Sequence, residues 1–409
     1  MKVVNESFNK IKSIFNIIQG KIAFYPSIIA LAGVLLAIII TTLETTSVSN
    51  FLQENFTSLS IKSGDTALTM ISVCIGGLIS IMVFSFSVVM LLLSQASSNF
   101  SPRILPGLLS DKKNQYILGY YLGAIIYLMF ILFSIRPEAS ENSIPSLSIL
   151  IGVFITIFCL GSFIYFIHNM SQSIQIGNIL EKIFNQSKKR LKVLVEKQYD
   201  EEGSLKVNKN WNTYKINRCG YFQNFSQKNI LKICEENDTK IKILIPKGFF
   251  VLSNDDFLMS DKEIDEKILH KILNNFNFSK TELISDNYVL AFKQITEIAV
   301  KAMSPGINDP GTAINAIDYL TELLSLRMLK NDTDIHKFND ETLLEVKTLN
   351  FKKLIEDIVT SLKTYCMQDP ILAIKIKNMI NYLLEQKAYK EEYYSVLKNQ
   401  INLLEKELS

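Results

Sequence analysis

Histidine and cysteine are scarce in this chain of 409 residues, and neither type is arranged to bind a metal. The 5 cysteines are scattered without a Cys-x-x-Cys spacing, which indicates neither a disulfide framework nor a zinc site. The 3 histidines form no pair at ligand spacing. With 43 basic and 40 acidic residues the charge is nearly balanced, so the sequence does not indicate a partner nucleic acid.

Motifs by which enzymes are usually recognised are also missing. The sequence shows no nucleophile paired with a base, no metal-ligand spacing and no glycine loop that would cradle a phosphate. We therefore expect no enzymatic activity, no cofactor and no metal site.

Charged residues are absent from the centres of four long apolar runs, at about 24–43, 66–93, 116–135 and 147–167. Each run reaches the ~20 residues that a helix needs to cross a ~30 Å hydrocarbon core. The first run is too long for a secretory signal and lacks a small-residue cleavage site, so we expect it to stay in the mature protein. Without intramembrane charges, proton relays, voltage sensors and ion-coupled transport are disfavoured.

Basic residues near the ends of these runs predict the orientation. They concentrate in the N-terminal leader, in the second loop and after the fourth run, whereas the other two loops carry only Lys62 and Arg136 against five acidic residues. The positive-inside rule then places both termini in the cytoplasm. We expect a multi-pass protein of the inner (cytoplasmic) membrane, with the lipid bilayer as its first partner.

The remainder of the chain is charged and predicts a cytosolic α+β region attached to this membrane α-helical part. A helix over 66–101 would be roughly 54 Å long. After the spans, a basic helix is either a solvated connection or a contact with lipid headgroups through Lys188, Lys189 and Arg190. The expected parts are an amphipathic leader (1–23), four transmembrane helices (24–170), a connecting basic helix (171–200), a small β-rich module (201–260) and a helical domain with two αα-hairpins (261–409).

The stretch AVKAMSPGINDPGTAINAI (299–317) interrupts that helical domain with a turn. Asp309 is a favourable N-cap and Pro310 suits the first helical position, and the same pattern recurs at Asp369. Ser304 precedes Pro305 and is disfavoured in the α region, while Gly306 can take a positive φ for the reversal. The candidate functional turn comprises Ser304, Pro305, Gly306, Asn308, Asp309, Pro310 and Thr312.

Three interpretations of this turn are open. It is a structural hairpin in which Asn308 bonds the backbone, or a contact with another subunit or domain, or a ligand site at the free N–H groups of Gly311 and Thr312. In the last case Asp309 would repel an anion.

Small residues form a stripe on the second span. Ser80, Ser87 and Ser94 recur every seven residues, and Gly76 and Ser98 lie on the same helical face. Such a face either lets helices pack closely or lines a water-filled path. These five residues are candidates for pore lining or for helix packing.

Two segments resemble the signature segments of the DUF2254 family of predicted bacterial membrane proteins: VFSFSVVMLLLSQASSNFSPRIL (83–105) and IAVKAMSPGINDPGTAINAIDYL (298–320). FIHNMSQSIQ (166–175), GYFQ (220–223) and PKGFFV (246–251) support the resemblance. It implies the four-span layout and brings no established activity. Relatives tend to be arginine-rich before the Ser-Pro-Gly segment, whereas here FSKTELISD (278–286) has Lys280 as its only base.

Two function classes follow from these observations. The first is a homo-oligomeric, channel-like or passive transport assembly with the second span nearest its axis. The alternative is a membrane-anchored scaffold or sensor whose cytosolic region binds a protein or a small molecule of unknown identity.

Overall fold

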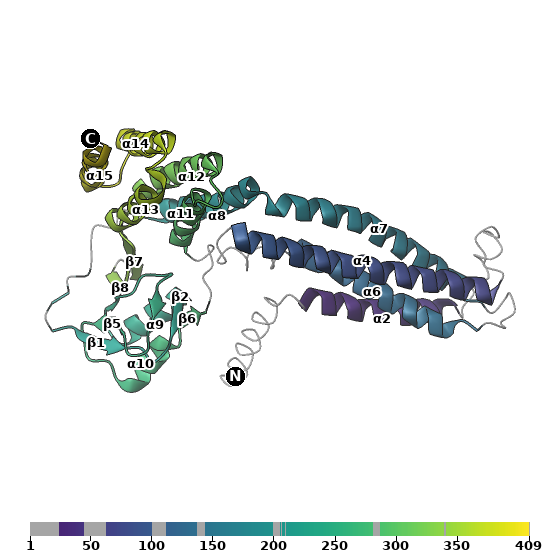
Figure 1. The fold of residues 1–409 in the computed structure, drawn as a ribbon. Coiled ribbons are helices and arrows are strands. Elements are labelled where there is room, and N and C mark those ends of the chain that lie inside the picture. The colour runs from purple at the N-terminus through teal and green to yellow at the C-terminus, as the bar shows by residue number, and fades with distance from the viewer. Residues whose placement is uncertain are drawn as a thin grey trace. The chain divides into compact units, whose positions relative to one another are not determined.

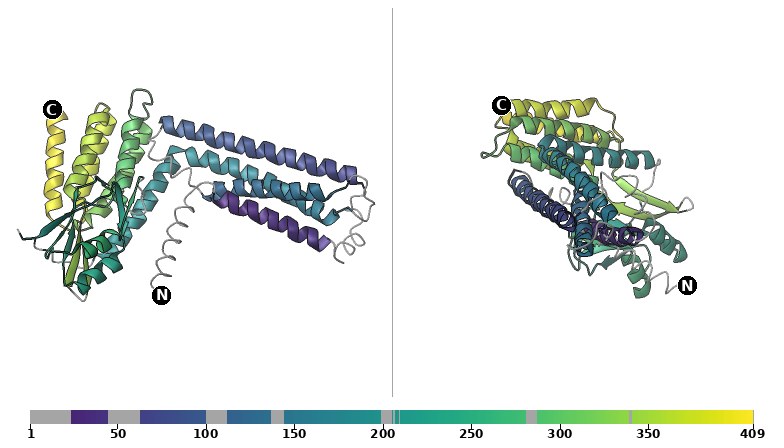
Figure 2. Two further views of the ribbon diagram at one scale, coloured as in Figure 1. Left: turned by 90° about the horizontal axis from the view of Figure 1, so that it is seen from below. Right: turned by 90° about the vertical axis from the view of Figure 1, so that its right-hand side faces the viewer.

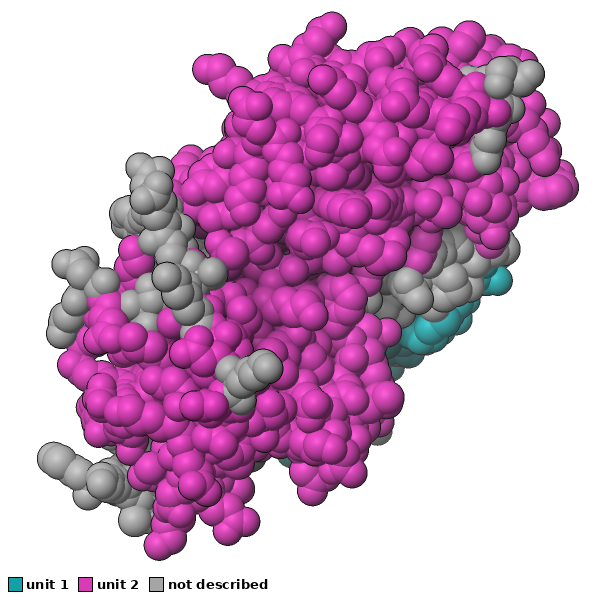
Figure 3. All heavy atoms as spheres, turned by 90° about the vertical axis from the view of Figure 1, so that its left-hand side faces the viewer, with its two compact units in different colours: residues 1–175 teal, residues 176–409 magenta. Residues whose placement is uncertain are grey.

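The computed structural model describes residues 24–44, 63–99, 112–136, 144–198, 205, 207–208, 210–280, 287–338 and 341–408. The chain divides into two compact units, residues 1–175 (unit 1) and 176–409 (unit 2), which are coloured separately in Figure 3. The expected leader over 1–23 lies outside the described residues.

Unit 1 is built from helices that lie side by side (Figures 1 and 2). Four helices in the described part of the chain are long and apolar enough to cross a membrane, which confirms the four predicted spans. They are α2 (Phe24–Glu44), α4 (Gly64–Asn99), α6 (Lys112–Ser134) and α7 (Ser146–Ile174). Helix α4 has 36 residues, about 54 Å at 1.5 Å per residue, so the long second helix is confirmed.

Helix α2 packs on α6 at a close crossing. A Cβ atom on Gly33 would meet the backbone carbonyl of Gly123, so only glycine lets the two helices approach this closely. At the C-terminal end of α2, Glu44 accepts hydrogen bonds from the N–H groups of Leu147 (2.8 Å) and Ser148 (3.1 Å). A carboxylate from one helix therefore caps the N-terminus of another.

Unit 2 begins with α8 (Ile176–Lys197), which is the expected basic helix. Its apolar face is buried against α11 and α12, with Leu180 and Leu191 fully covered, and the rings of Phe184 and Tyr319 pack in a tilted arrangement with 4.8 Å between their centroids. Lys188 pairs with Glu322 of α12. The helix is an integral part of unit 2. Its buried apolar face corrects the expectation of a solvated connecting helix, and the alternative of a headgroup contact stays a prediction.

Two sheets form the β-rich part of unit 2. The five-stranded sheet has the order β1-β5-β3-β8-β7, in which only the β3–β8 pair is parallel, and the three-stranded antiparallel sheet has the order β4-β2-β6. Phe222, Phe257 and Phe276 pack edge to face in the core beside these sheets. The strands are β1 (Asn212–Lys215), β2 (Gly220–Phe225), β3 (Ile241–Ile243), β4 (Phe250–Val251), β5 (Asp256–Ser260), β6 (Phe276–Ser279), β7 (Thr333–Phe338) and β8 (Glu341–Lys347), with helices α9 (Gln227–Glu236) and α10 (Glu266–Leu273).

Strands β6, β7 and β8 correct the expectation that 261–409 is wholly helical. The hairpin β7–β8 enters the five-stranded sheet beside β3, which lies about a hundred residues earlier in the chain. Leu343, Leu344 and Val346 of β8 are all buried, so the strand lacks the alternating pattern that marks a half-exposed one. Tertiary pairing therefore decided the conformation of a segment with an ambiguous local pattern.

The other helices of unit 2 are α11 (Tyr288–Ala302), α12 (Pro310–Met328), α13 (Phe351–Cys366), α14 (Pro370–Glu385) and α15 (Glu392–Leu408). Both predicted Asp-Pro caps are confirmed. Asp309 accepts the N–H of Thr312 at 3.0 Å, and Asp369 accepts the N–H groups of Ile371 and Leu372 at 2.8 and 3.2 Å. Proline follows at the first helical position in each case.

Candidate functional site

The small-residue stripe of α4 lies on an exposed face of unit 1. Gly76, Ser80, Ser87 and Ser94 are all exposed, and a Cβ on Gly76 would have no neighbour within 4 Å. Ser80 and Ser87 donate their hydroxyls to the carbonyls of Gly76 (2.8 Å) and Val83 (2.9 Å) in the preceding turn. These hydroxyls are satisfied within their own helix, so the face can meet lipid, another helix or water. The side chain of Ser98 lies outside the described residues.

The turn between α11 and α12 is a surface hairpin. Ser304 accepts the N–H groups of Ile307 and Asn308 through its carbonyl, both at 3.0 Å, and its hydroxyl donates to Lys301 O at 2.7 Å. Asn308 takes the positive φ of 46°, whereas Gly306 does not, which corrects the expected place of the reversal. Asparagine tolerates this conformation better than most residues. Asn308 bonds the backbone through its own N–H.

The carboxylate of Asp309 occupies the N-terminus of α12. It accepts both the N–H and, at 2.6 Å, the hydroxyl of Thr312, and these bonds lower its pKa. Because the N–H of Thr312 is already bonded and the adjacent charge is negative, this helix end is poorly suited to an anion. Pro305 and Gly306 are exposed beside it, and Pro310 is half-buried.

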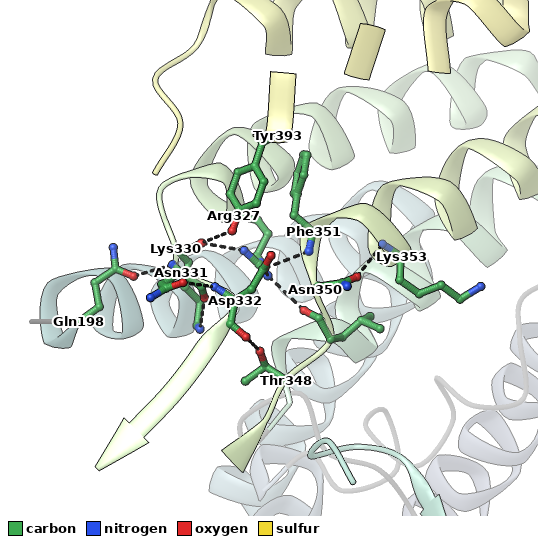
Figure 4. Close-up of polar contacts among 11 residues, drawn as sticks. Gln198, Arg327, Lys330, Asn331, Asp332, Thr348, Asn350, Phe351, Lys353 and Tyr393 are labelled. Carbon is green, nitrogen blue, oxygen red and sulfur yellow. Dashed lines mark hydrogen bonds and ion pairs between the residues drawn. The ribbon is translucent and has the colours of Figure 1, made fainter. Parts of the chain in front are cut away.

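A buried charge network that sequence reasoning missed lies in the helical part of unit 2 (Figure 4). Arg327 has no exposed surface, and its guanidinium pairs with Asp332 and donates to Lys330 O (2.9 Å) and Leu349 O (3.1 Å). Asp332 also accepts the N–H of Phe351 at 3.0 Å. One charged pair therefore ties the end of α12 to the starts of β7 and α13.

Further bonds extend this network to α8 and α15. Gln198 accepts the N–H of Asn331 at 2.8 Å and donates to Leu329 O at 2.5 Å, and Tyr393 donates to Lys330 O at 3.2 Å. Residues from α13 and α15, together with Gln198 just after α8, therefore make hydrogen bonds to the segment 329–332 (Figure 4).

A cavity of about 50 Å³ lies next to this network, entirely within unit 2. Residues from five separate segments line it: α8, the Pro-Lys-Gly turn before β4, the start of α11, the segment after α12, and the end of β8. The lining residues are Arg190, Leu194, Pro246, Lys247, Asn287, Tyr288, Val289, Lys330, Asp334, Val346, Lys347, Thr348 and Leu349. Basic residues dominate the charged part of this lining, which we call the basic cavity.

Charges at the basic cavity influence one another. The Nζ of Lys247 lies 3.7 Å from a carboxylate oxygen of Asp334 and 4.5 Å from the ring centre of Phe225. The other carboxylate oxygen of Asp334 lies 3.4 Å from the Nε2 of His336. Burial lowers the pKa of Lys247; Asp334 opposes this and Arg190 reinforces it. Burial alone would raise the pKa of Asp334, but His336 and Lys247 outweigh it and lower that pKa. Burial likewise lowers the pKa of His336.

Two polar side chains at the basic cavity have unused donors. Asn287 is 5% exposed and caps α11 by accepting the N–H of Val289 at 3.1 Å, yet its Nδ2 has no hydrogen-bond partner among the described residues. The Nε of Arg190 is also buried without a partner in that part of the chain. Gly248, at φ 82°, leaves room for the Asn287 amide, since a Cβ there would clash with it.

Sequence reasoning missed the basic cavity because its residues share no motif spacing. The only local signal was the Pro246-Lys247-Gly248 turn, which the sequence marks as a chain reversal and nothing more. As for metals, no group of three or more histidine, cysteine, aspartate or glutamate residues in the described ranges could hold an ion.

Comparison with known proteins decides the family. The model of a family described as predicted membrane protein (DUF2254) matches residues 19–382, which is most of the chain. The chain belongs to the DUF2254 family. The resemblance seen in the sequence is thereby confirmed, and the family description together with the four apolar helices indicates a membrane location.

Curated proteins similar to this chain include an uncharacterised protein of Mycobacterium bovis and another of Mycobacterium tuberculosis. Each is 23% identical over 273 residues, which cover 60% of this chain and 50% of the relative. The chain thus spans about half the length of the curated relatives it matches. No solved structure matches the chain.

Proposed function

We propose that this DUF2254 protein is a membrane-anchored sensor whose unit 2 lies in the cytoplasm and binds a small polar ligand in the basic cavity. The unused donor of Asn287 carries the proposal, because a buried amide N–H without an acceptor costs free energy that a ligand acceptor would recover. The distribution of lysine and arginine around the four spans supports the cytoplasmic placement and the inner membrane.

The position of the cavity supports a signalling role. It joins α8, the first helix after the spans, to the β-rich part through Lys247 and to the helical hairpins through Lys330. A ligand that contacts three elements at once favours the arrangement of those elements to which it binds most tightly. The free energy of this stabilisation equals the difference in its binding free energy between that arrangement and the alternatives. A change in unit 2 would reach the membrane helices through α8, which follows α7 directly in the chain.

Asn287→Asp tests this proposal because it alters the donor and preserves the cap. Aspartate caps a helix as well as asparagine does, but it replaces the Nδ2 donor by an acceptor and adds a negative charge. Asn350→Asp is the matched control, since Asn350 caps α13 by accepting the N–H of Lys353 at 2.8 Å and does not line the cavity.

Native mass spectrometry of the full chain taken from its own membranes provides the readout. We expect the wild type and Asn350→Asp to carry a bound small molecule that Asn287→Asp lacks. Wild-type protein that carries no small molecule, or an Asn287→Asp variant that keeps it, would refute the ligand-binding function.

A second function that we propose is a passive, channel-like homo-oligomer. The exposed Gly76, Ser80 and Ser87 of α4 support it, because several copies could bring this face together around an axis. Ser87→Leu should then change bilayer conductance while the assembly persists. Native mass spectrometry that finds only a monomer or a dimer would contradict the channel, since too few α4 helices would be present to enclose a path.

A further inference from the structure

The lining of the basic cavity carries an excess of positive charge. It contains four basic residues, Arg190, Lys247, Lys330 and Lys347, and one acidic residue, Asp334. Like charges that share a partly desolvated site repel one another, and the repulsion is larger than it would be in water. An arrangement of this kind is stabilised when an anion enters it.

The positive groups of the lining outnumber the carboxylates that could pair with them. Arg190 makes no ion pair among the residues that the structure describes, and Lys330, 6% exposed, directs its Nζ to the carbonyl of Asn331 at 2.8 Å. Asp334 pairs with Lys247 at 3.7 Å, so its charge is already compensated. The net field at the cavity therefore favours a negative ligand.

Neutral donors at the same place add to this field. The Nδ2 of Asn287 is an unused donor in a side chain that is 95% buried. Tyr288 and Val289, which open the 15-residue helix α11, also line the cavity, so the positive end of that helix dipole faces it. Positive side chains, an amide donor and a helix N-terminus together match an oxyanion with several acceptor oxygens.

The size of the cavity limits what it can hold. A bound water needs roughly 10–15 Å³ of cavity volume. The basic cavity, at about 50 Å³, therefore accommodates a group of a few heavy atoms. A phosphate group is of this order, whereas a nucleoside would have to extend beyond the cavity.

We infer that the basic cavity binds a phosphate group through Arg190, Lys247, Lys330 and Asn287. This inference rests on the proposed ligand-binding function and adds the chemical class of the ligand. The group belongs either to free phosphate or a soluble phosphate ester, or to a phospholipid headgroup, since the recognition chemistry is the same.

The test uses the full chain in a nonionic detergent that contains no phosphate and follows the melting temperature by tryptophan fluorescence. In one arm inorganic phosphate is titrated against potassium chloride of matched ionic strength, which controls for screening. In the other arm, without inorganic phosphate, phosphatidylglycerol is added to the detergent micelles. Apparent affinities follow from the dependence of melting temperature on ligand concentration.

Four variants are compared with the wild type. Arg190→Gln and Lys247→Gln should each weaken the apparent affinity by about tenfold or more, because each removes a charge-assisted hydrogen bond. Asn287→Asp should abolish binding and keep the cap. Lys267→Gln, on the exposed surface of α10, is the matched control and should bind as the wild type does.

Each outcome decides the inference. A rise in melting temperature with phosphate and not with chloride supports a soluble phosphate, and a rise only with phosphatidylglycerol supports a headgroup. No rise in either arm, or a rise that Arg190→Gln and Asn287→Asp retain, overturns the inference. If a small molecule still co-purifies with the wild type and not with Asn287→Asp, the proposed function stands and only the phosphate assignment fails.

Discussion

Removal of Asp332 is the most direct test of how unit 2 is held together. In Asp332→Ala the guanidinium of Arg327, which has no exposed surface, loses its only carboxylate partner among the described residues and cannot shed its proton. The N–H of Phe351 loses its acceptor as well. Breaking a buried ion pair by removing one partner costs about 3–5 kcal/mol. For a unit of this size, that corresponds to a fall in melting temperature of roughly 6–20 °C.

The chain offers a selective probe for this measurement. Its single tryptophan is Trp211, which belongs to unit 2, so intrinsic fluorescence during heating of the full chain in detergent follows that unit. Asp318→Ala is the matched control, because Asp318 is 57% exposed in its pair with Lys375 and should cost only about 0–1 kcal/mol.

If the melting temperature of Asp332→Ala lies within a degree or two of that of Asp318→Ala, the buried pair does not stabilise unit 2 and the reasoning is refuted. A double variant, Arg327→Met with Asp332→Ala, adds a second check. It should regain part of the lost stability, because the uncompensated buried charge is gone.

Three further predictions concern two turns and the buried histidine His336, which lies beside Asp334. Asp309→Ala should lower the unfolding free energy by about 1 kcal/mol as a lost cap, and a loss of function at unchanged melting temperature would instead show that the turn is a site. Gly248→Ala should cost at least about 1–2 kcal/mol, because it combines a positive φ with a clash against Asn287, and unchanged melting would contradict that geometry. Burial lowers the pKa of His336, so the unfolded chain binds more protons below about pH 6.5 and acidification should destabilise unit 2. His336→Asn should flatten this pH dependence of melting and the exposed His270→Asn should not; equal slopes would argue against a buried neutral imidazole.

Local signals predicted the fold well where the chain obeys one strong rule. Apolar runs of sufficient length become helices in a bilayer whatever surrounds them, so the four spans and the long α4 were predictable. Asp309 and Asp369 cap helices because an acceptor next to a proline satisfies the adjacent N–H groups locally. The reversal at Asn308 was misplaced to Gly306 because both residues tolerate positive φ, and only the surrounding bonds choose between them.

Non-local contacts decided the rest. Strand β8 became a strand because β3 and β7 supply its hydrogen bonds, and the apolar face of α8 is buried because α11 and α12 cover it. The sequence by itself determined the family, the membrane spans and the helix caps, since these depend on residues that are neighbours in the chain. Only the tertiary structure brought Arg190, Lys247, Asn287 and Lys330 to one cavity, because an electrostatic site depends on distances in space that no spacing along the chain records.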